Sequence, residues 1–294
     1  MEPADFYNIR GASFTALRRE LGWLVGAAAA THPAEERLSR ALAAGLLHLD
    51  DPDRLRTTAV SLAASVPPDP ENLGERDRRE WAMLFAQLMG TGRHWLPLNQ
   101  ALALLWSVGP WRDELRQLLQ LMADRADHRV HRLPWAQPVP LCVHGCYSRA
   151  EVLAAFAAVD DRGAPLSHRE GVFWHQPTAT DLLFITLRKS DALFSPTTRY
   201  RDLALSPSLF HWESQSTTTA ASPTGQRYIH HVARGSRVLL FVREQRKKDG
   251  VTEPFVCLGF ATYESHKGER PMEIRWRLER EIPAPFLPVM GLAV

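Results

Sequence analysis

The chain has 294 residues, 45% of them apolar and 23% charged, and a formal net charge of +2. This length is enough for one large domain or two ordinary ones, each with a buried core. The sequence has no run of about eighteen apolar residues, which excludes a protein that spans the bilayer by helices. Three cysteines make no disulfide framework, and the first residues lack the basic and apolar segments of a signal peptide. We therefore expect a globular protein of the cytoplasm with no membrane partner.

Positive charge is concentrated in the second half of the chain. Residues 136–294 carry 15 Arg, 4 Lys and 16 acids, a net charge of +3, whereas residues 1–135 carry 16 Arg, no Lys and 17 acids, a net charge of −1. This asymmetry permits a nucleic-acid partner without requiring one, because polyanion binding depends on where the charge lies on the surface.

The first half of the chain has the pattern of a helical domain. From Phe14 to about Asp127 the apolar residues recur at helical spacing, which predicts five or six helices. Helix start signals occur at residues 31–33, 51–53 and 109–110, and the proline-rich residues 66–74 predict a loop. One apolar stripe is typical of helix-packing core; it contains Trp111, Leu115, Leu118, Leu119 and Met122. We expect a helical domain over residues 1–134.

The second half of the chain is rich in short strand-like runs. A capping-box pattern at Ser148 and Glu151 predicts one short helix over residues 147–156. Residues 272–278 alternate with period two, so that Met272 and Trp276 share one face of a strand. Further strands are predicted at residues 171–174, 182–187, 237–243 and 255–263. Many short strands with little helix indicate a small barrel or curled sheet, over residues 135–294, and an α+β chain.

Several enzyme chemistries lack their motifs. There is no Gly-Lys-Ser/Thr, hence no P-loop, and no His-Glu-x-x-His or paired Cys-x-x-Cys. A zinc site at Cys142, His144 and Cys146 would lack a fourth ligand, so small buried side chains are the favoured interpretation of the two cysteines. A metal-dependent nuclease could use Asp202 and Glu213 with Lys189, although their spacing is poor. We expect no cofactor, no metal and no catalytic residue, and keep the nuclease as an alternative.

Residues 194–228 combine aromatics, arginines, amides and hydroxyls in a segment that is neither a good strand nor a typical linker. Aromatic faces can stack on bases, while Arg, Ser and Thr can bind phosphate oxygens. The alternative is that the aromatics are core and the hydroxyls cap turns. The predicted DNA- and base-binding residues are Trp174, Phe194, Thr198, Arg199, Tyr200, Arg201, Asp202, Phe210, His211, Trp212, Glu213, Ser214, Gln215, Ser216, Arg227 and Tyr228.

These residues also carry a resemblance. The blocks 144–156, 181–187, 194–202 and 222–229, with Phe-His-Trp-Glu-Ser-Gln-Ser at 210–216, resemble the C-terminal region of bacterial superfamily-2 helicases that have phospholipase-D-type nuclease domains. Among these are ATP-dependent type IV restriction enzymes that act on methylcytosine DNA. The resemblance implies a PUA- or SRA-like fold and recognition of modified cytosine. The helicase and nuclease domains do not occur in these 294 residues, so translocation and cutting are not implied.

Residues and resemblance together lead to one hypothesis and two alternatives. We expect a module that binds modified double-stranded DNA, extrudes the base and holds it in an aromatic pocket formed by Trp212 with Phe210 or Trp174. Such a module would serve restriction or phage defence. The alternatives are the metal-dependent nuclease and a non-catalytic subunit that docks on a separately encoded helicase or nuclease.

Overall fold

The computed structural model describes residues 6–7, 13–126, 128–188, 202–248 and 250–292. The chain divides into two compact units. The first contains residues 1–130, 135–141 and 145–167, and the second contains residues 131–134, 142–144 and 168–294. The units interleave in sequence between residues 131 and 168, and the domain boundary expected at residue 135 stays a prediction. Within the described residues, no helix has both the length and the apolar character needed to cross a membrane.

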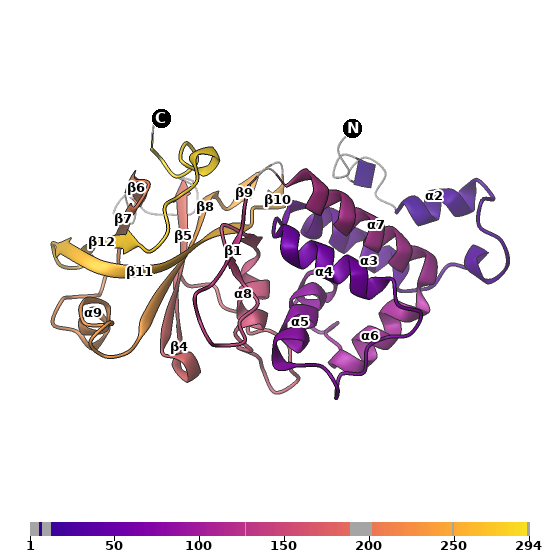
Figure 1. Ribbon diagram of the computed structural model, residues 1–294, viewed down its shortest axis with the longest axis horizontal. Coiled ribbons are helices and arrows are strands. Elements are labelled where there is room, and N and C mark those ends of the chain that lie inside the picture. Colours follow the sequence, from indigo (N-terminus) through magenta and orange to yellow (C-terminus); the bar gives the residue numbers. More distant parts are fainter. Residues whose placement is uncertain (1–5, 8–12, 127, 189–201, 249, 293–294) are drawn as a thin grey trace. The chain divides into compact units, whose positions relative to one another are not determined.

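The first unit is mainly helical (Figure 1). Ser13 and Asp51 cap two of its helices through their side chains, and Ser148 with Glu151 forms the predicted capping box. The loop over residues 66–74 is present as predicted. The elements of the unit are α2 (Phe14–Glu20), η1 (Gly26–Ala29), α3 (Glu35–Ala44), η2 (Leu46–His48), α4 (Pro52–Leu62), α5 (Glu75–Met89), α6 (Leu98–Ser107), α7 (Gly109–Arg125), β3 (Cys146–Tyr147) and α8 (Arg149–Ala155).

The apolar stripe of α7 lies in the core of this unit, as the helical spacing predicts. Trp111, Leu115 and Leu119 are buried, and Leu118 and Met122 pack against the same core. These positions recur every three or four residues, so one face of the helix removes them together from water. The stripe is therefore scaffold.

A buried ion pair joins α4 to α8 inside the first unit. Arg54 Nη2 lies 2.7 Å from Glu151 Oε1, and the two side chains are only 6% and 0% exposed. The Arg54 guanidinium also lies 5.6 Å from the centre of the Tyr147 ring, whose hydroxyl donates to Asp51. Burial raises the pKa of the Glu151 carboxyl, and the nearby Arg54 charge opposes this shift. The pair is thus costly to desolvate and depends on both partners being present.

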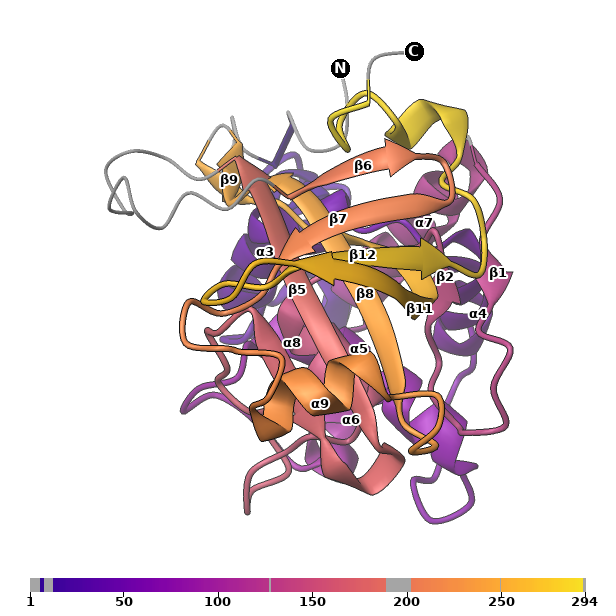
Figure 2. The same ribbon diagram turned by 90° about the vertical axis from the view of Figure 1, so that its left-hand side faces the viewer.

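The second unit is built on one curled sheet (Figure 2). Its main strands run in the order β4-β5-β8-β11-β12-β7-β6, with β5 and β8 parallel and the other neighbours antiparallel. Its elements are β1 (His131–Arg132), β2 (Cys142–Val143), β4 (Val172–His175), η3 (Gln176–Thr178), β5 (Thr180–Arg188), β6 (Leu203–Ser206), β7 (Leu209–Glu213), α9 (Pro223–Ile229), β8 (Arg237–Gln245), β9 (Lys247–Lys248), β10 (Val251–Thr252), β11 (Phe255–Lys267), β12 (Glu273–Leu278) and η5 (Ala284–Phe286).

The sheet is open in the part of the chain that the structure describes. The strand order ends at β4 on one side and β6 on the other, and these two strands do not pair. The mixed α+β class is confirmed, whereas the expected barrel is not: the described strands form a sheet with two edges. β12 has the predicted alternation, because Ile274, Trp276 and Leu278 are buried while Glu273, Arg275 and Arg277 are exposed.

One glycine shapes the centre of this sheet. The register between β8 and β11 shifts between Cys257 and Gly259, and Gly259 has a φ of +85°. A Cβ at this position would lie 3.0 Å from a methyl group of Val143. Glycine is therefore required both by the left-handed backbone and by the close approach of β2.

Candidate functional site

The predicted site residues fall into three groups. Five of them, Phe194, Thr198, Arg199, Tyr200 and Arg201, lie outside the described residues. A second group forms the core, the β6–β7 edge of the sheet and the turn between β7 and α9. The third group, Trp174 and Arg227, lies at the partly exposed end of the sheet beside α9.

The aromatic residues of the second group are buried. Phe210 is 0%, Trp212 5% and Tyr228 0% exposed. Trp212 contacts Tyr228 and Trp276, with ring centroids 5.5 and 6.4 Å apart. The alternation of β7 explains this, since Phe210 and Trp212 face one side of the sheet while His211 and Glu213 face the other. The interpretation of residues 209–213 as a poor strand was wrong, because two bulky aromatics at period two are a strand signal.

The polar residues after β7 bond to one another and to the neighbouring strand. The Met272 amide donates to Ser214 Oγ at 2.9 Å. Gln215 Oε1 accepts hydrogen bonds from Thr218 Oγ1 and from the Tyr228 hydroxyl, each at 3.3 Å. Ser216 is exposed. These contacts fix the turn that leads from β7 to α9.

Asp202, Glu213 and His211 lie at the β6–β7 edge of the sheet. The buried Asp202 accepts a hydrogen bond from the Glu213 amide at 2.8 Å. His211 Nε2 lies 3.8 Å from Glu273 Oε2. Within the described residues no group of three or more His, Cys, Asp and Glu side chains could hold a metal ion. Lys189 of the nuclease alternative lies outside these residues, so that alternative stays a hypothesis.

The third group is organised around a buried carboxylate. Asp181, on β5, is 0% exposed and accepts two hydrogen bonds from Arg227, from Nε at 2.7 Å and from Nη2 at 2.8 Å. The guanidinium carbon lies 4.5 Å from the ring centre of Trp174, which is opposite Asp181 on the edge strand β4. This bidentate pair holds a planar cation next to an indole ring.

Burial and pairing act in opposite directions on the two charged groups of this pair. Burial raises the pKa of the Asp181 carboxyl, and the hydrogen bonds and charge of Arg227 oppose that shift. For Arg227, burial favours the neutral form, but the bonds to Asp181 outweigh it and raise the pKa of the guanidinium. The Arg227 side chain keeps 22% of its surface exposed, and Trp174 is half-buried. Arg227 and Trp174 are thus both partly accessible to solvent at the end of the sheet.

A basic turn follows α9 and leads into β8. Residues 230–237 contain His230, Arg234 and Arg237, all exposed, and no acid. Arg237 begins β8 opposite Thr180, the residue before Asp181. Figure 2 shows α9 across the ends of β5 and β8, where this turn leads into β8. The turn therefore carries exposed positive charge directly after the helix that holds Arg227.

Sequence reasoning missed three residues of this cluster: Asp181, Arg234 and Arg237. Asp181 lies in an otherwise apolar strand, Thr-Asp-Leu-Leu-Phe-Ile, and an acid in such a run is a signal for a buried partner. Arg234 and Arg237 flank Gly235, whose φ is +69°. No local pattern shows that Asp181 lies opposite Trp174 on β4, because that follows from the strand order.

Comparison with known proteins identifies a family for the second half of the chain. The model of a family described as "Domain of unknown function (DUF3427)" matches residues 141–287, which is half of the chain. The matched region includes β4, β5, α9 and the basic turn. No curated protein matches the chain.

Proposed function

The chain belongs to the DUF3427 family, and from this premise we propose that its second unit binds double-stranded DNA and recognises a modified base. Modified cytosine is the favoured target, in line with the resemblance to helicase-linked restriction enzymes. The observation that carries the proposal is the Asp181–Arg227 pair against Trp174, a fixed planar cation and an indole at one partly exposed position.

The proposed fold is an open variant of the PUA- or SRA-like base readers. Its support is the antiparallel pair of β8 and β11, in which a glycine-led strand pairs with one that carries a central glycine, Gly259. Readers of this kind take the base out of the stack and hold it against aromatic walls. Because Phe210 and Trp212 are buried, the proposal assigns the wall to Trp174.

The proposed roles follow from the chemistry of the cluster. The exposed part of the Trp174 indole stacks on the extruded base, and Asp181 fixes Arg227 so that little side-chain entropy is lost on binding. His230, Arg234 and Arg237 contact phosphates beside the base. Cleavage and translocation are left to a separately encoded helicase or nuclease partner, in restriction or phage defence.

Trp174→Ala is expected to weaken binding to the modified duplex by about 1–3 kcal/mol, the usual contribution of one base–aromatic stack. Binding to the unmodified duplex should change much less. The measurement is an anisotropy titration of the full chain against matched unmodified and cytosine-methylated duplexes at one fixed salt concentration, since phosphate binding depends on salt.

The matched control is Phe173→Ala, which removes an aromatic from the opposite face of the same strand, where it contacts His168 and His175. It should leave the preference for modified DNA intact. If Trp174→Ala weakens binding to both duplexes equally, or if the wild-type chain binds both equally, the base-reading role is wrong.

Arg234→Ala is expected to weaken binding to both duplexes by the same factor. A lysine or arginine that neutralises one phosphate releases about one counterion, so the slope of log K against log salt should become shallower by about 0.9. The measurement is the same titration repeated over a series of salt concentrations. An unchanged slope would remove Arg234 from the proposed DNA surface.

A further inference from the structure

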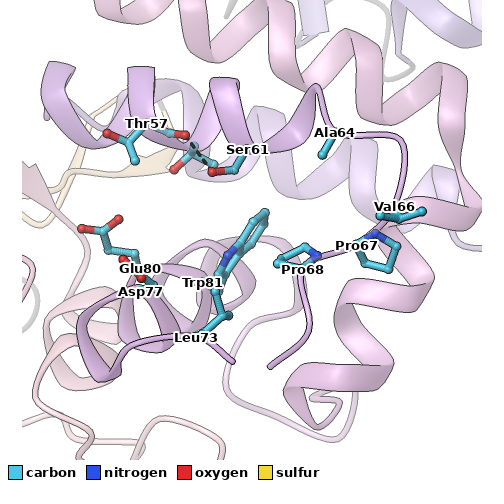
Figure 3. Close-up of a pocket in the computed structure, with 11 residues that line it drawn as sticks. Thr57, Ser61, Ala64, Val66, Pro67, Pro68, Leu73, Asp77, Glu80 and Trp81 are labelled. Carbon is cyan, nitrogen blue, oxygen red and sulfur yellow. Dashed lines mark hydrogen bonds between the residues drawn. The ribbon is translucent and has the colours of Figure 1, made fainter. Parts of the chain in front are cut away.

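A cavity of about 510 Å³ lies in the helical unit, between α4, α5 and the loop that joins them (Figure 3). This volume is within the range of small-ligand pockets. Its walls are formed by Thr57, Thr58, Ser61, Ala64, Val66, Pro67, Pro68, Leu73, Asp77, Glu80 and Trp81. Neither the predicted site nor the family match includes these residues, and the inference drawn from them does not depend on the proposed DNA binding.

The two ends of this cavity differ in chemistry. Figure 3 shows Asp77, Glu80 and Thr57 at one end, and Val66, Pro67 and Pro68 at the other. The Trp81 indole lies between them and is held by stacking on Phe85, with ring centroids 6.0 Å apart. A matching ligand has a polar head and an apolar body or flank.

The polar end accepts hydrogen bonds and carries negative charge. Both ionisable residues in the wall are acids, Asp77 and Glu80. The hydroxyls of Thr57 and Ser61 donate to the backbone oxygens of Asp53 and Thr57, each at 3.0 Å, so toward the cavity they offer acceptor lone pairs. An acceptor-rich acidic wall fits a cation that has several donors.

The cation that fits this wall best is a guanidinium. It has five N–H donors in a plane and stacks on indole and proline surfaces, whereas an ammonium has three donors and is more strongly hydrated. The apolar end favours a polypeptide source, because Val66, which lines the cavity, is 67% exposed. A free small cation would leave this valine in water.

We propose that this cavity binds an arginine side chain of a partner polypeptide, with the guanidinium at Asp77 and Glu80 and flanking apolar residues of the partner on Val66. Arg76, on α5, already lies with Nε 3.2 Å from Glu80 Oε1, and a carboxylate has room for a second donor.

Glu80 should make the proposed arginine binding depend on pH. Burial raises the pKa of its carboxyl; Arg76 on α5 and Arg54 on α4 oppose the shift, while Asp77 on α5 and Asp51 before α4 add to it. Arginine binding should weaken as the pH falls through this raised pKa, because the protonated acid loses its charge. Glu80→Gln should remove that part of the pH dependence.

The test is calorimetric titration of the full chain with the peptide acetyl-Val-Arg-Val-amide, and with its neutral isostere in which citrulline replaces arginine. The arginine peptide should bind with a dissociation constant below about 1 mM, and the citrulline peptide at least about ten-fold more weakly. This comparison needs no variant, so it holds even if a substitution in α5 fails to fold.

Variants then locate the site. Glu80→Gln should reduce the affinity for the arginine peptide by about ten-fold or more, while Asp161→Asn, an exposed acid of the same unit, should not change it. The proposal is overturned if the two peptides bind equally, if neither binds, or if Glu80→Gln binds as the wild type does. Butylguanidinium, a free alkylguanidinium with the same single charge, should bind more weakly than the peptide; equal binding would overturn the assignment to a polypeptide.

Discussion

Replacing Arg227 by methionine is expected to lower the free energy of unfolding by about 3–5 kcal/mol, because it leaves a fully buried carboxylate without its partner. Asp181 is 0% exposed and receives two hydrogen bonds from Arg227. Methionine keeps much of the side-chain volume, so the loss measures the missing charge and hydrogen bonds. Chemical denaturation of the full chain, followed by circular dichroism, gives the value.

The loss in free energy of unfolding caused by Arg227→Met should also depend on pH. Burial already raises the pKa of Asp181 with Arg227 in place, and removing the guanidinium raises it further. In the unfolded chain an aspartate has a pKa of about 3.9. Because the folded pKa of Asp181 is higher, this group contributes to stability below the unfolded pKa, and the contribution is lost as the pH rises through the folded pKa. The deficit should therefore be larger at about pH 8 than near pH 5.

Two further variants control this experiment. Arg234→Met, at an exposed arginine of the same unit, should leave stability nearly unchanged. The double variant Asp181→Leu with Arg227→Met should recover a large part of the loss, because an apolar pair carries no desolvation cost. A deficit below about 1 kcal/mol for Arg227→Met would show that water reaches Asp181 and that the pair does not organise the cluster.

Replacing Arg54 by methionine is expected to lower the free energy of unfolding by a similar amount, about 3–5 kcal/mol. Glu151 is 0% exposed and would lose the charge that lies 2.7 Å from its Oε1. The helix that carries Glu151 has only seven residues, so its position depends on such tertiary contacts. Thermal and urea unfolding of the full chain would show the loss.

The matched comparison is Arg40→Met in the same helical unit. Arg40 forms an ion pair with Glu36, but both side chains are more than 70% exposed, at 72% and 73%. Exposed pairs of this kind contribute little to stability. Equal effects of Arg54→Met and Arg40→Met would mean that the α4–α8 pair is hydrated in solution.

Much of the secondary structure could be predicted because its signals are local. The Asp51-Pro52 start of α4, the capping box at Ser148 and the loop before α5 are fixed by neighbouring residues. The strands that became β5, β8, β11 and β12 were also predicted, with ends that differ by a few residues. β7 was missed, because its hydroxyl- and arginine-rich surroundings were given more weight than its period-two aromatics.

The candidate site was predictable only in part. Trp174 and Arg227 were named from residue type, and the structure brings them together, but Asp181, which positions Arg227, was not. The three residues are separated by up to 53 positions in sequence and meet because β4 pairs with β5 and α9 lies against β5. Binding by Trp174 or Arg227 stays a prediction.

The sequence by itself determined the α+β class, the capped helices, the alternation of β12 and the absence of a P-loop, because each depends on residues a few positions apart. Only the tertiary structure decided which aromatics are core, which arginine is clamped by a carboxylate and where an acidic cavity lies. The physical reason is that burial and pairing depend on strand order and helix packing, which bring distant residues into contact. Phe210 and Trp174 are both aromatic residues of strands, yet Phe210 is fully buried in the core, whereas Trp174 is half-buried beside Arg227.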